Sequence, residues 1–231
     1  MYIYGKNVVT EYLKNNKKIK KAYIYKNFND DLILSAIQKR NIEVKFMEKF
    51  ELDKLANASH QGIILNVPDY TYAQLEELLI KENPFLVILD HLEDPHNFGA
   101  IIRTCEAAGV DGIIIPKNRS VDVNSTAIKV STGAIDYMKI ACVTNLNQTI
   151  RELKEKGFWI VGTDMEGTDY DKIDYTGKIA IVIGNEGNGM SRLVQESCDF
   201  IAKIPMQGTV NSLNASVATG IVVFEATLKR K

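Results

Sequence analysis

Residues 204–221 read Ile-Pro-Met-Gln-Gly-Thr-Val-Asn-Ser-Leu-Asn-Ala-Ser-Val-Ala-Thr-Gly-Ile and join an apolar strand to the last helix of the chain. The strand is predicted over 200–204 and stops at Pro205, because proline cannot donate to a sheet ladder. Asn211 or Ser212 is predicted to cap a helix that runs to about residue 228. Ser212 and Asn214 then lie beside free backbone N–H groups. This arrangement is typical of an ordinary capped helix, and equally of a site for a polar small molecule.

The chain before this stretch alternates apolar strands with helices from about residue 72. Phe85–Asp90 is predicted as a strand buried on both faces, because its residues up to Leu89 are all apolar. Further strands are predicted at Gly112–Ile115, Met138–Val143, Phe158–Thr163 and Lys178–Ile183, and helices at Tyr72–Lys81, Asn97–Ala108, Asn124–Ser131, Asn145–Lys156 and Ser191–Ser197. This alternation predicts an α/β fold with a mainly parallel sheet covered on both sides.

Residues 1–67 are predicted to form a smaller alternating α/β unit, followed by a linker at 68–71. The helix at Asp31–Arg40 is indicated by apolar residues at helical spacing, which are Leu32, Ile33, Ala36 and Ile37. The other predicted elements are helices at Lys6–Leu13 and Glu51–Ala56 and strands at Lys21–Tyr25, Glu43–Phe46 and Gly62–Val67. The expected organisation is therefore one domain at 1–70, a linker and helix at 71–83, and a second domain at 84–231.

Charge is divided unevenly between these two parts. Residues 1–70 hold 12 Lys and Arg and 8 Asp and Glu, whereas the remainder holds 16 and 21. The segment between Tyr12 and Asn29 contains no acidic residue, and Tyr12, Tyr23 and Tyr25 are interleaved with its lysines Lys14, Lys17, Lys18, Lys20, Lys21 and Lys26. Such a segment suits the phosphate backbone of a nucleic acid, although a solvated charged face has the same composition.

The overall composition, with 45% hydrophobic and 25% charged residues, is typical of a globular protein. No apolar run reaches the length of a membrane span, and the first residues lack the layout of a signal peptide, so a cytoplasmic protein is expected. Cys105, Cys142 and Cys198 are far apart and fit neither a disulfide framework nor a zinc site, so buried thiols are expected.

The last helix is apolar around much of its circumference. Its apolar residues from 213 onward are Leu213, Ala215, Val217, Ala218, Ile221, Val222, Val223, Phe224, Ala226 and Leu228. A helix of this kind is normally buried, and a domain of this size needs a second subunit to bury it completely. We therefore expect a homodimer.

Two further motifs follow predicted strands. The first is Leu89-Asp90-His91-Leu92-Glu93-Asp94-Pro95-His96-Asn97-Phe98-Gly99-Ala100-Ile101-Ile102-Arg103-Thr104, in which Asn97 begins a helix and Arg103 lies six residues on. Both side chains can therefore line one cleft. Arg103 suits an RNA phosphate, although an exposed ion pair is the simpler alternative. The Asp and His residues of the turn lack a recognised metal-ligand spacing, so no metal is expected.

The second motif is Ile181-Val182-Ile183-Gly184-Asn185-Glu186-Gly187-Asn188-Gly189-Met190-Ser191. Its G-x-x-G-x-G spacing differs from the dinucleotide fingerprint, and the Lys-Ser/Thr pair of a phosphate loop is missing. Glycines let a backbone approach a ligand closely. Glu186 is informative because a carboxylate between glycines contributes little to packing. Since all three motifs follow parallel strands, they are expected at one edge of the sheet.

Together, in this order and spacing, the three motifs resemble the SpoU branch of the SPOUT methyltransferases, over about residues 84–228. Ile3-Tyr4-Gly5-Lys6-Asn7-Val8-Val9-Thr10-Glu11-Tyr12-Leu13 and His60-Gln61-Gly62-Ile63-Ile64 resemble the two ends of an L30e-like RNA-binding domain. Such a domain precedes the catalytic domain in bacterial enzymes that methylate a guanosine 2′-oxygen of 23S rRNA. The resemblance covers nearly the whole chain.

This resemblance implies a catalytic domain with a C-terminal trefoil knot that binds S-adenosylmethionine largely through backbone groups, in a homodimer. The residues implied in cofactor binding are Thr163, Gly184, Gly187, Gly189, Ile204, Met206 and Leu213. Those implied in catalysis are Asn97, Arg103, Glu186, Ser212 and Asn214, and the lysines expected to contact RNA are Lys14, Lys17, Lys18, Lys20 and Lys21. The implied reaction transfers a methyl group in line from a sulfonium to a ribose 2′-oxygen and needs no metal.

Within this resemblance, Arg103 is expected to orient the ribose and stabilise the alkoxide, because a guanidinium does not normally lose its proton. Glu186 is expected to hold Asn97 or Arg103 in place, and Ser212 and Asn214 to orient the hydroxyl or the phosphate. The target nucleotide stays open. A guanosine of 23S rRNA is favoured, with tRNA, an rRNA adenosine as in thiostrepton-resistance relatives, and RNA binding without catalysis as alternatives.

Overall fold

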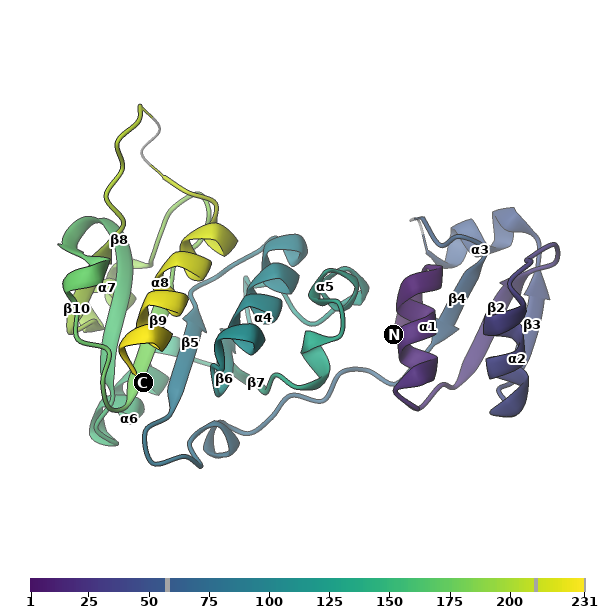
Figure 1. Ribbon diagram of the computed structural model, residues 1–231, viewed down its shortest axis with the longest axis horizontal. Helices are drawn as coiled ribbons and strands as arrows, with labels where there is room; N and C mark the ends of the chain where they lie inside the picture. Colours follow the sequence, from purple (N-terminus) through teal and green to yellow (C-terminus); the bar gives the residue numbers. More distant parts are fainter. Residues whose placement is uncertain (57–58, 210–211, 231) are drawn as a thin grey trace. The chain divides into compact units, whose positions relative to one another are not determined.

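The computed structural model describes residues 1–56, 59–209 and 212–230, and the chain forms two compact units (Figure 1). The first unit contains Met1–Thr71 and Val123–Gly133, and the second contains Tyr72–Asp122 and Ala134–Lys231. Val123–Gly133, which the sequence places within the second predicted domain, therefore groups with the N-terminal residues.

The first unit is built on a four-stranded sheet in the order β1-β4-β2-β3. Strands β2 and β3 are parallel, whereas β4 is antiparallel to both β1 and β2. Its elements are β1 (Tyr2–Tyr4), α1 (Lys6–Lys14), β2 (Lys21–Tyr25), α2 (Asp31–Lys39), β3 (Val44–Met47), α3 (Lys49–Leu55), β4 (Ile63–Asn66) and α5 (Ser125–Ser131). On one face, Met47, Leu52 and Ile64 pack with the tyrosines of β1 and β2.

Two details of this unit differ from the sequence-based expectation. The strand β1 was not predicted, because three residues carry too little periodicity, and it exists through its pairing of Tyr2 with Asn66. Leu32 was assigned to the apolar face of α2 but is 85% exposed. Ile33 and Ile37 form the buried side of this helix instead, and Asp30 caps it by accepting from Ile33 N at 3.3 Å.

The second unit is built on a six-stranded sheet in the order β10-β8-β9-β5-β6-β7, in which every neighbouring pair is parallel. This confirms the predicted α/β fold with a parallel sheet. Its strands are β5 (Phe85–Leu89), β6 (Gly112–Pro116), β7 (Ile140–Val143), β8 (Trp159–Asp169), β9 (Ile179–Ile183) and β10 (Phe200–Lys203). Its helices are α4 (Pro95–Ala108), α6 (Leu146–Glu155), α7 (Arg192–Ser197) and α8 (Ala215–Lys229), with 3-10 turns η1 (Leu75–Leu78), η2 (Ala134–Asp136) and η3 (Tyr170–Lys172).

The central strands β5 and β9 are buried at every residue, as their continuous apolar sequences predict. On one face of the sheet, Leu86, Ile88 and Val182 pack against Ile150 and Leu153 of α6. The connections β5-α4-β6 and β7-α6-β8 run in opposite directions along the sheet, so right-handed crossovers place α4 and α6 on opposite faces. Helices α4 and α8 lie side by side, and Thr227 Oγ1 donates to Ala108 O at 3.0 Å (Figure 1).

The predicted helix at Tyr72–Lys81 is wrong over most of its length. Only Leu75–Leu78 form a 3-10 turn, and Ala73 instead makes a parallel bridge to Ala141, with its N–H donating to Ile140 O at 2.8 Å. The bridge to the edge of β7 uses the backbone N–H of Ala73, and this pairing replaces the predicted start of the helix. Strand β8 is also longer than predicted and continues past Thr163 to Asp169, where it pairs with β10. The C-terminal trefoil knot stays a prediction.

Helix α8 begins at Ala215 with Asn214 as its cap, later than the predicted cap at Asn211 or Ser212. Asn211 lies outside the described residues. The helix is not buried all round within one chain, because Val217, Phe224 and Leu228 are exposed by 50%, 45% and 62%. None of the helices in the described part of the chain has the length and apolar character needed to cross a membrane.

The cysteines follow the expectation of buried thiols only in part. Cys105 is buried, whereas Cys142 and Cys198 are half-buried. Burial raises the pKa of each thiol, that of Cys198 to about 12. All three are therefore protonated, and weak nucleophiles, near neutral pH.

Candidate active site

The carboxyl ends of β5 and β9 are joined directly in the sheet. Leu89 pairs with Ile183, and Asp90 N donates to Ile183 O at 2.8 Å. The turn that leads into α4 therefore lies against the glycine-rich loop that follows β9. Parallel sheets commonly place ligands at this edge.

The start of α4 is set by local sequence. Asp94 caps the helix by accepting from His96 N at 2.9 Å, and Pro95 occupies the first turn, where its missing N–H costs no hydrogen bond. Helix α4 thus begins two residues earlier than predicted, and Asn97 lies within its first turn. Asn97 is only 8% exposed, so its amide needs partners inside the protein.

Those partners come from the other two motifs. Asn97 Nδ2 donates to Glu186 Oε1 at 2.9 Å, and Asn97 Oδ1 accepts from Asn214 Nδ2 at 2.9 Å. Asn214 Oδ1 in turn accepts from Ser216 N at 2.9 Å and so caps α8. A continuous hydrogen-bonded row, Glu186–Asn97–Asn214, therefore joins three segments that are far apart in the sequence.

The loop after β9 is held by a second set of contacts, which sequence reasoning missed. Asn185 Nδ2 donates to His91 O at 2.7 Å, while Asn185 Oδ1 accepts from Gly187 N at 2.9 Å. Asp90 is 1% exposed, and its carboxylate accepts from Ser191 N at 2.6 Å and contacts His91 Nδ1 at 2.5 Å. These contacts clamp both ends of the glycine-rich loop to the turn before α4.

The sequence motifs predict no role for Asn185 and no metal at the acidic turn that contains Asp90. The available signal was a polar residue just after each buried strand, Asp90 after β5 and Asn185 after β9. Within the described residues, no group of three or more His, Cys, Asp or Glu side chains comes together in a way that could hold a metal ion.

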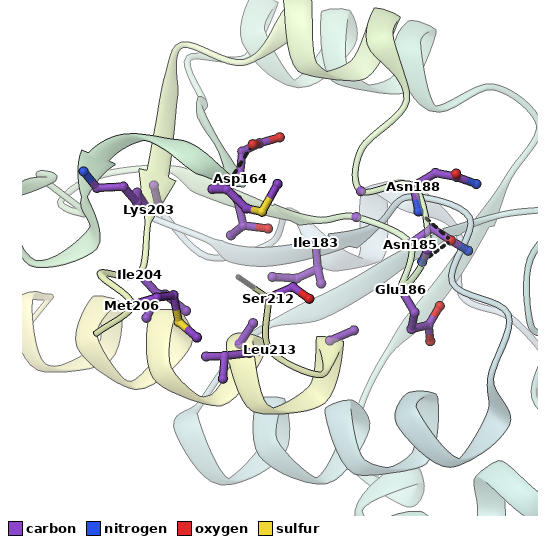
Figure 2. Close-up of a pocket in the computed structure, with 18 of the residues that line it drawn as sticks. Asp164, Ile183, Asn185, Glu186, Asn188, Lys203, Ile204, Met206, Ser212 and Leu213 are labelled. Atoms are coloured by element: carbon purple, nitrogen blue, oxygen red, sulfur yellow. Dashed lines mark hydrogen bonds between the residues drawn. The ribbon is translucent and has the colours of Figure 1, made fainter. Parts of the chain in front are cut away.

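A cavity of about 760 Å³ adjoins this row, and Glu186 is part of its lining (Figure 2). It is lined by all seven residues predicted to bind the cofactor, and also by Glu186 and Ser212. The apolar side chains of Ile204, Met206 and Leu213 gather on the side next to α8, across from Glu186 and the glycine-rich loop. The seven residues are Thr163, Gly184, Gly187, Gly189, Ile204, Met206 and Leu213.

Gly184 and Gly189 favour glycine for different physical reasons, one steric and one conformational. A Cβ on Gly184 would lie 2.3 Å from Gly189 C and 2.4 Å from Met190 N, so only glycine lets the loop fold back on itself. A Cβ on Gly189 would meet nothing within 4 Å, but its φ of +67° favours glycine. The loop thus presents backbone N–H and C=O groups to the cavity with little side-chain cover.

The cavity wall also contains two charged residues that had not been predicted, Asp164 and Lys203. Asp164 Oδ2 accepts from Gln195 Nε2 at 3.3 Å, and Lys203 Nζ lies 3.4 Å from Asp169 Oδ1. Thr163 Oγ1 donates to Val182 O at 3.0 Å, which ties β8 to β9 beneath the cavity. Apolar walls, exposed backbone groups and a few polar side chains are typical of a nucleoside-binding pocket.

Among the described residues, Arg103 makes no hydrogen bond to this row, and it does not line the cavity. It is exposed on α4, and it has no hydrogen-bond or ion-pair partner within residues 1–56, 59–209 and 212–230. The alternative of a surface ion pair therefore has no support among these residues. Its guanidinium is free to meet a group from outside the chain.

The lysines predicted to contact RNA lie in unlike surroundings. Lys14, Lys18 and Lys20 are exposed. Lys17 Nζ lies 4.5 Å from the ring centroid of Tyr12, and partial burial lowers its pKa. Lys21 pairs with Glu43 at 2.5 Å, so its charge is partly neutralised. Their contacts with RNA stay a prediction.

Comparison with known proteins decides the family. The family model of the SpoU rRNA methylases matches residues 84–224, and the model for the substrate-binding domain of RNA 2′-O ribose methyltransferases matches residues 2–73. The chain belongs to the SpoU rRNA methylase family. It is an RNA ribose 2′-O-methyltransferase, and S-adenosylmethionine is its methyl donor.

Relatives in this family match the chain over nearly its full length. YacO of Bacillus subtilis (strain 168), assigned to the TrmH family of tRNA/rRNA methyltransferases, is 44% identical over 238 residues, which cover 99% of this chain and 96% of the relative. An AdoMet-bound rRNA methyltransferase from Sinorhizobium meliloti has a TM-score of 0.77 at 28% identity, covering 97% and 85% of the two chains. AviRb from Streptomyces viridochromogenes, in complex with AdoMet, shares the fold with a TM-score of 0.83 at 22% identity, covering 99% and 89%.

The residues of this chain fit the cofactor of the family. The cavity combines apolar side chains suited to an adenine with backbone groups that can bind its edge, and the space beyond Gly189 is open. When bound, S-adenosylmethionine supplies a methyl group on a positively charged sulfur. Glu186 lines the cavity and also contacts Asn97, so the row Glu186–Asn97–Asn214 adjoins the cavity.

Proposed function

We propose that this enzyme methylates the ribose 2′-oxygen of a guanosine in 23S rRNA. The observation that carries the proposal is the row Glu186–Asn97–Asn214 next to a cavity of nucleoside character. Family membership favours this enzymatic function over RNA binding alone. The match of residues 2–73 to a substrate-binding domain adds a second surface for the RNA, which a large structured substrate would use.

Each motif residue has a role in this proposal. Asn97, held between Glu186 and Asn214, presents a rigid polar surface next to the methyl donor. Ser212 lines the cavity and orients the ribose hydroxyl. Arg103 binds the phosphate of the target nucleotide and stabilises negative charge that develops on the 2′-oxygen. Alignment of the two reactants then accounts for about 7–11 kcal/mol of the barrier in favourable cases.

The cofactor is held by Thr163, Gly184, Gly187, Gly189, Ile204, Met206 and Leu213 in this proposal. Ile204, Met206 and Leu213 enclose the adenine, and the glycine-rich loop supplies backbone groups. The C-terminal trefoil knot is expected to form around this cavity. Because Glu186 is the one acid or base side chain that joins the row among the residues described by the structure, the chain's contribution is mainly positioning and electrostatic.

The quaternary structure and the RNA surface complete the proposal. The exposed apolar residues of α8, Val217, Phe224 and Leu228, support a homodimer in which the partner covers this helix. The N-terminal lysines contact the RNA backbone, with Lys14, Lys18 and Lys20 the most accessible. A cytoplasmic location follows from an RNA substrate of this kind.

Transfer of a tritiated methyl group from S-adenosylmethionine to unmodified 23S rRNA and to bulk tRNA transcripts tests the proposal. We expect label on 23S rRNA that maps to one 2′-O-methylguanosine. The relatives are assigned to tRNA/rRNA methyltransferases, so tRNA is the second candidate. Label on tRNA alone, or on an rRNA adenosine, would show that the substrate differs from the proposed one while the reaction is the same. The absence of label from both 23S rRNA and tRNA would overturn the proposal.

A further inference from the structure

The arginines of the chain fall into two groups. Arg192 pairs with Glu196, Arg230 donates to three backbone carbonyls, and Arg40 donates to two. Arg103, Arg119 and Arg151, in contrast, have no hydrogen-bond or ion-pair partner within the part of the chain that the structure describes, and all three are exposed. An unpaired exposed guanidinium is available to a ligand, and the position of each one in the fold decides which ligand it can meet.

Arg119 lies in the loop that follows β6, at the same edge of the sheet as the active site. The sheet order places β6 directly beside β5, whose carboxyl end leads to Asn97, and the cofactor cavity lies on the other side of β5 toward β9 and β8. Adjacent strands are about 4.8 Å apart. The loop after β6 therefore lies one strand beyond the catalytic row, in the direction away from the cofactor.

Both ends of this loop are fixed to neighbouring segments. Lys117 N donates to Val143 O at 2.8 Å, while Val121 N and Ser120 Oγ both donate to Leu92 O, at 2.7 and 3.2 Å. Leu92 belongs to the turn that precedes α4, so the loop is anchored to the segment that positions Asn97. Arg119, at the tip, has a φ of +51°, a left-handed conformation that is uncommon for residues other than glycine. The anchored ends hold the backbone of Arg119 at this edge of the sheet, and its side chain is exposed there.

Charge separates this side of the sheet edge from the other. Toward β10, Lys203 and Lys172 are both engaged by Asp169, and Asp164 adds a second carboxylate. Toward β6, Lys117 and Arg119 have no ion-pair partner among residues 1–56, 59–209 and 212–230, and Asp122 is the one carboxylate of the 117–122 loop. Glu93 is a further exposed carboxylate, in the neighbouring turn. The cations that are free to bind a polyanionic strand therefore lie toward β6, where Arg119 can act together with Arg103.

We propose that Arg119 binds a backbone phosphate of the RNA substrate next to the target nucleotide, on the side of β6. This inference rests on the proposed function and adds the direction in which the RNA strand leaves the active site. Arginine suits the role because its planar donors bind a phosphate in a bidentate manner. Such a contact fixes the register of the RNA and carries no sequence information by itself.

The test compares Arg119→Gln and Arg119→Lys with the matched control Arg151→Gln. Arg151 is exposed and unpaired like Arg119, but α6 packs on the face of the sheet opposite to α4. Binding of unmodified 23S rRNA and bulk tRNA transcripts is measured by filter binding at several salt concentrations. Methyl transfer gives kcat and KM, calorimetry gives the Kd for S-adenosylmethionine, and sedimentation gives the oligomeric state.

We expect Arg119→Gln to raise the KM for the methylated RNA on the order of tenfold, with kcat and the Kd for S-adenosylmethionine unchanged. The slope of log K against log salt should become shallower by about 0.7–0.9, as loss of one phosphate contact predicts. Arg119→Lys should retain the salt slope and lose part of the affinity, and Arg151→Gln should match the unmodified enzyme.

An Arg119→Gln variant that binds RNA with the salt slope of Arg151→Gln would overturn the proposal. A shifted sedimentation coefficient with unchanged RNA affinity would also overturn it and would assign the loop to a protein contact. If the unmodified enzyme transferred no methyl group to either RNA, the proposed function would fail. The salt slopes on the same transcripts would still decide whether Arg119 binds RNA.

Discussion

Asn97 and Glu186 are 89 residues apart in the sequence, and the side-chain amide of Asn97 donates to the carboxylate of Glu186 at 2.9 Å. Because Asn97 is buried, the loss of this acceptor leaves a donor without a partner, which costs about 1–3 kcal/mol. Glu186→Ala is therefore expected to lower kcat at least tenfold. Glu186→Gln should retain more activity, because its side-chain oxygen can still accept from Asn97.

Steady-state kinetics of methyl transfer measure both Glu186 variants, with the free energy of unfolding determined in urea as a control for folding. If Glu186→Gln were as damaged as Glu186→Ala while both remained folded, the charge of the carboxylate would matter more than its hydrogen bond, and the positioning role would be wrong.

Asn214 has two functions that one substitution can separate. Its Oδ1 caps α8, and its Nδ2 donates to Asn97. Asn214→Asp keeps the cap but replaces the donor with an oxygen that faces Asn97 Oδ1, so we expect a folded protein with little activity. Asn214→Ala loses both contacts and should also lower the free energy of unfolding by about 1 kcal/mol. Urea unfolding and methyl transfer measure the two effects, and an active Asn214→Asp variant would remove the donor from the mechanism.

Arg103 is expected to contribute to turnover through the RNA substrate and not to the stability of the fold or to cofactor binding. Because it is exposed and unpaired among the described residues, Arg103→Ala should leave the melting temperature and the affinity for S-adenosylmethionine unchanged while nearly abolishing turnover. Arg103→Lys, which keeps the charge without the bidentate geometry, should recover only part of the activity. Calorimetry and methyl transfer are the measurements. Full activity of Arg103→Ala would exclude this residue from the mechanism.

The contacts of Asn185 predict an effect on cofactor binding. Asn185→Ala removes the bond to His91 O and the support of Gly187 N, which should loosen the glycine-rich loop that lines the cavity. We expect the Kd for S-adenosylmethionine to rise about tenfold, the equivalent of ~1.4 kcal/mol. Asn188→Ala is the comparison, since the Asn188 side chain is exposed in the same loop and lines the same cavity, whereas the contacts to His91 O and Gly187 N belong to Asn185. Equal Kd values for both variants would refute the clamp.

Two glycines provide opposite expectations for stability. Gly184→Ala would place a Cβ 2.3 Å from the backbone of Gly189, so it should disturb the loop and abolish cofactor binding. Gly220→Ala, within α8, meets only Thr104 Cγ2 at 3.9 Å and should raise the free energy of unfolding by about 0.5–1 kcal/mol through helix propensity. Thermal unfolding with and without S-adenosylmethionine tests both, and a Gly184→Ala variant that binds cofactor normally would contradict the packing argument.

The sequence by itself determined the parallel sheet and the place of its active edge. Strands β5 and β9 are continuous apolar runs, so both of their faces had to be buried, and the polar motifs that follow them had to meet where parallel strands end. The two conclusions about the sheet depend only on local composition and on the regular geometry of a sheet. The cofactor and the residues expected to hold it were implied by the resemblance of the three motifs to the SpoU family.

Only the tertiary structure decided which residues pair across long separations in the sequence. It also decided where a predicted helix does not form, because a tertiary contact outweighs the local preference. The helix expected at Tyr72–Lys81 is largely absent because Ala73 pairs with Ala141, a contact that no local pattern encodes. The start of α8 at Ala215 is set by Asn214, which is fixed by its bond to Asn97. Likewise, Asn185 and Asp90 act through partners across the sheet edge, and their importance depends on burial, which composition does not reveal.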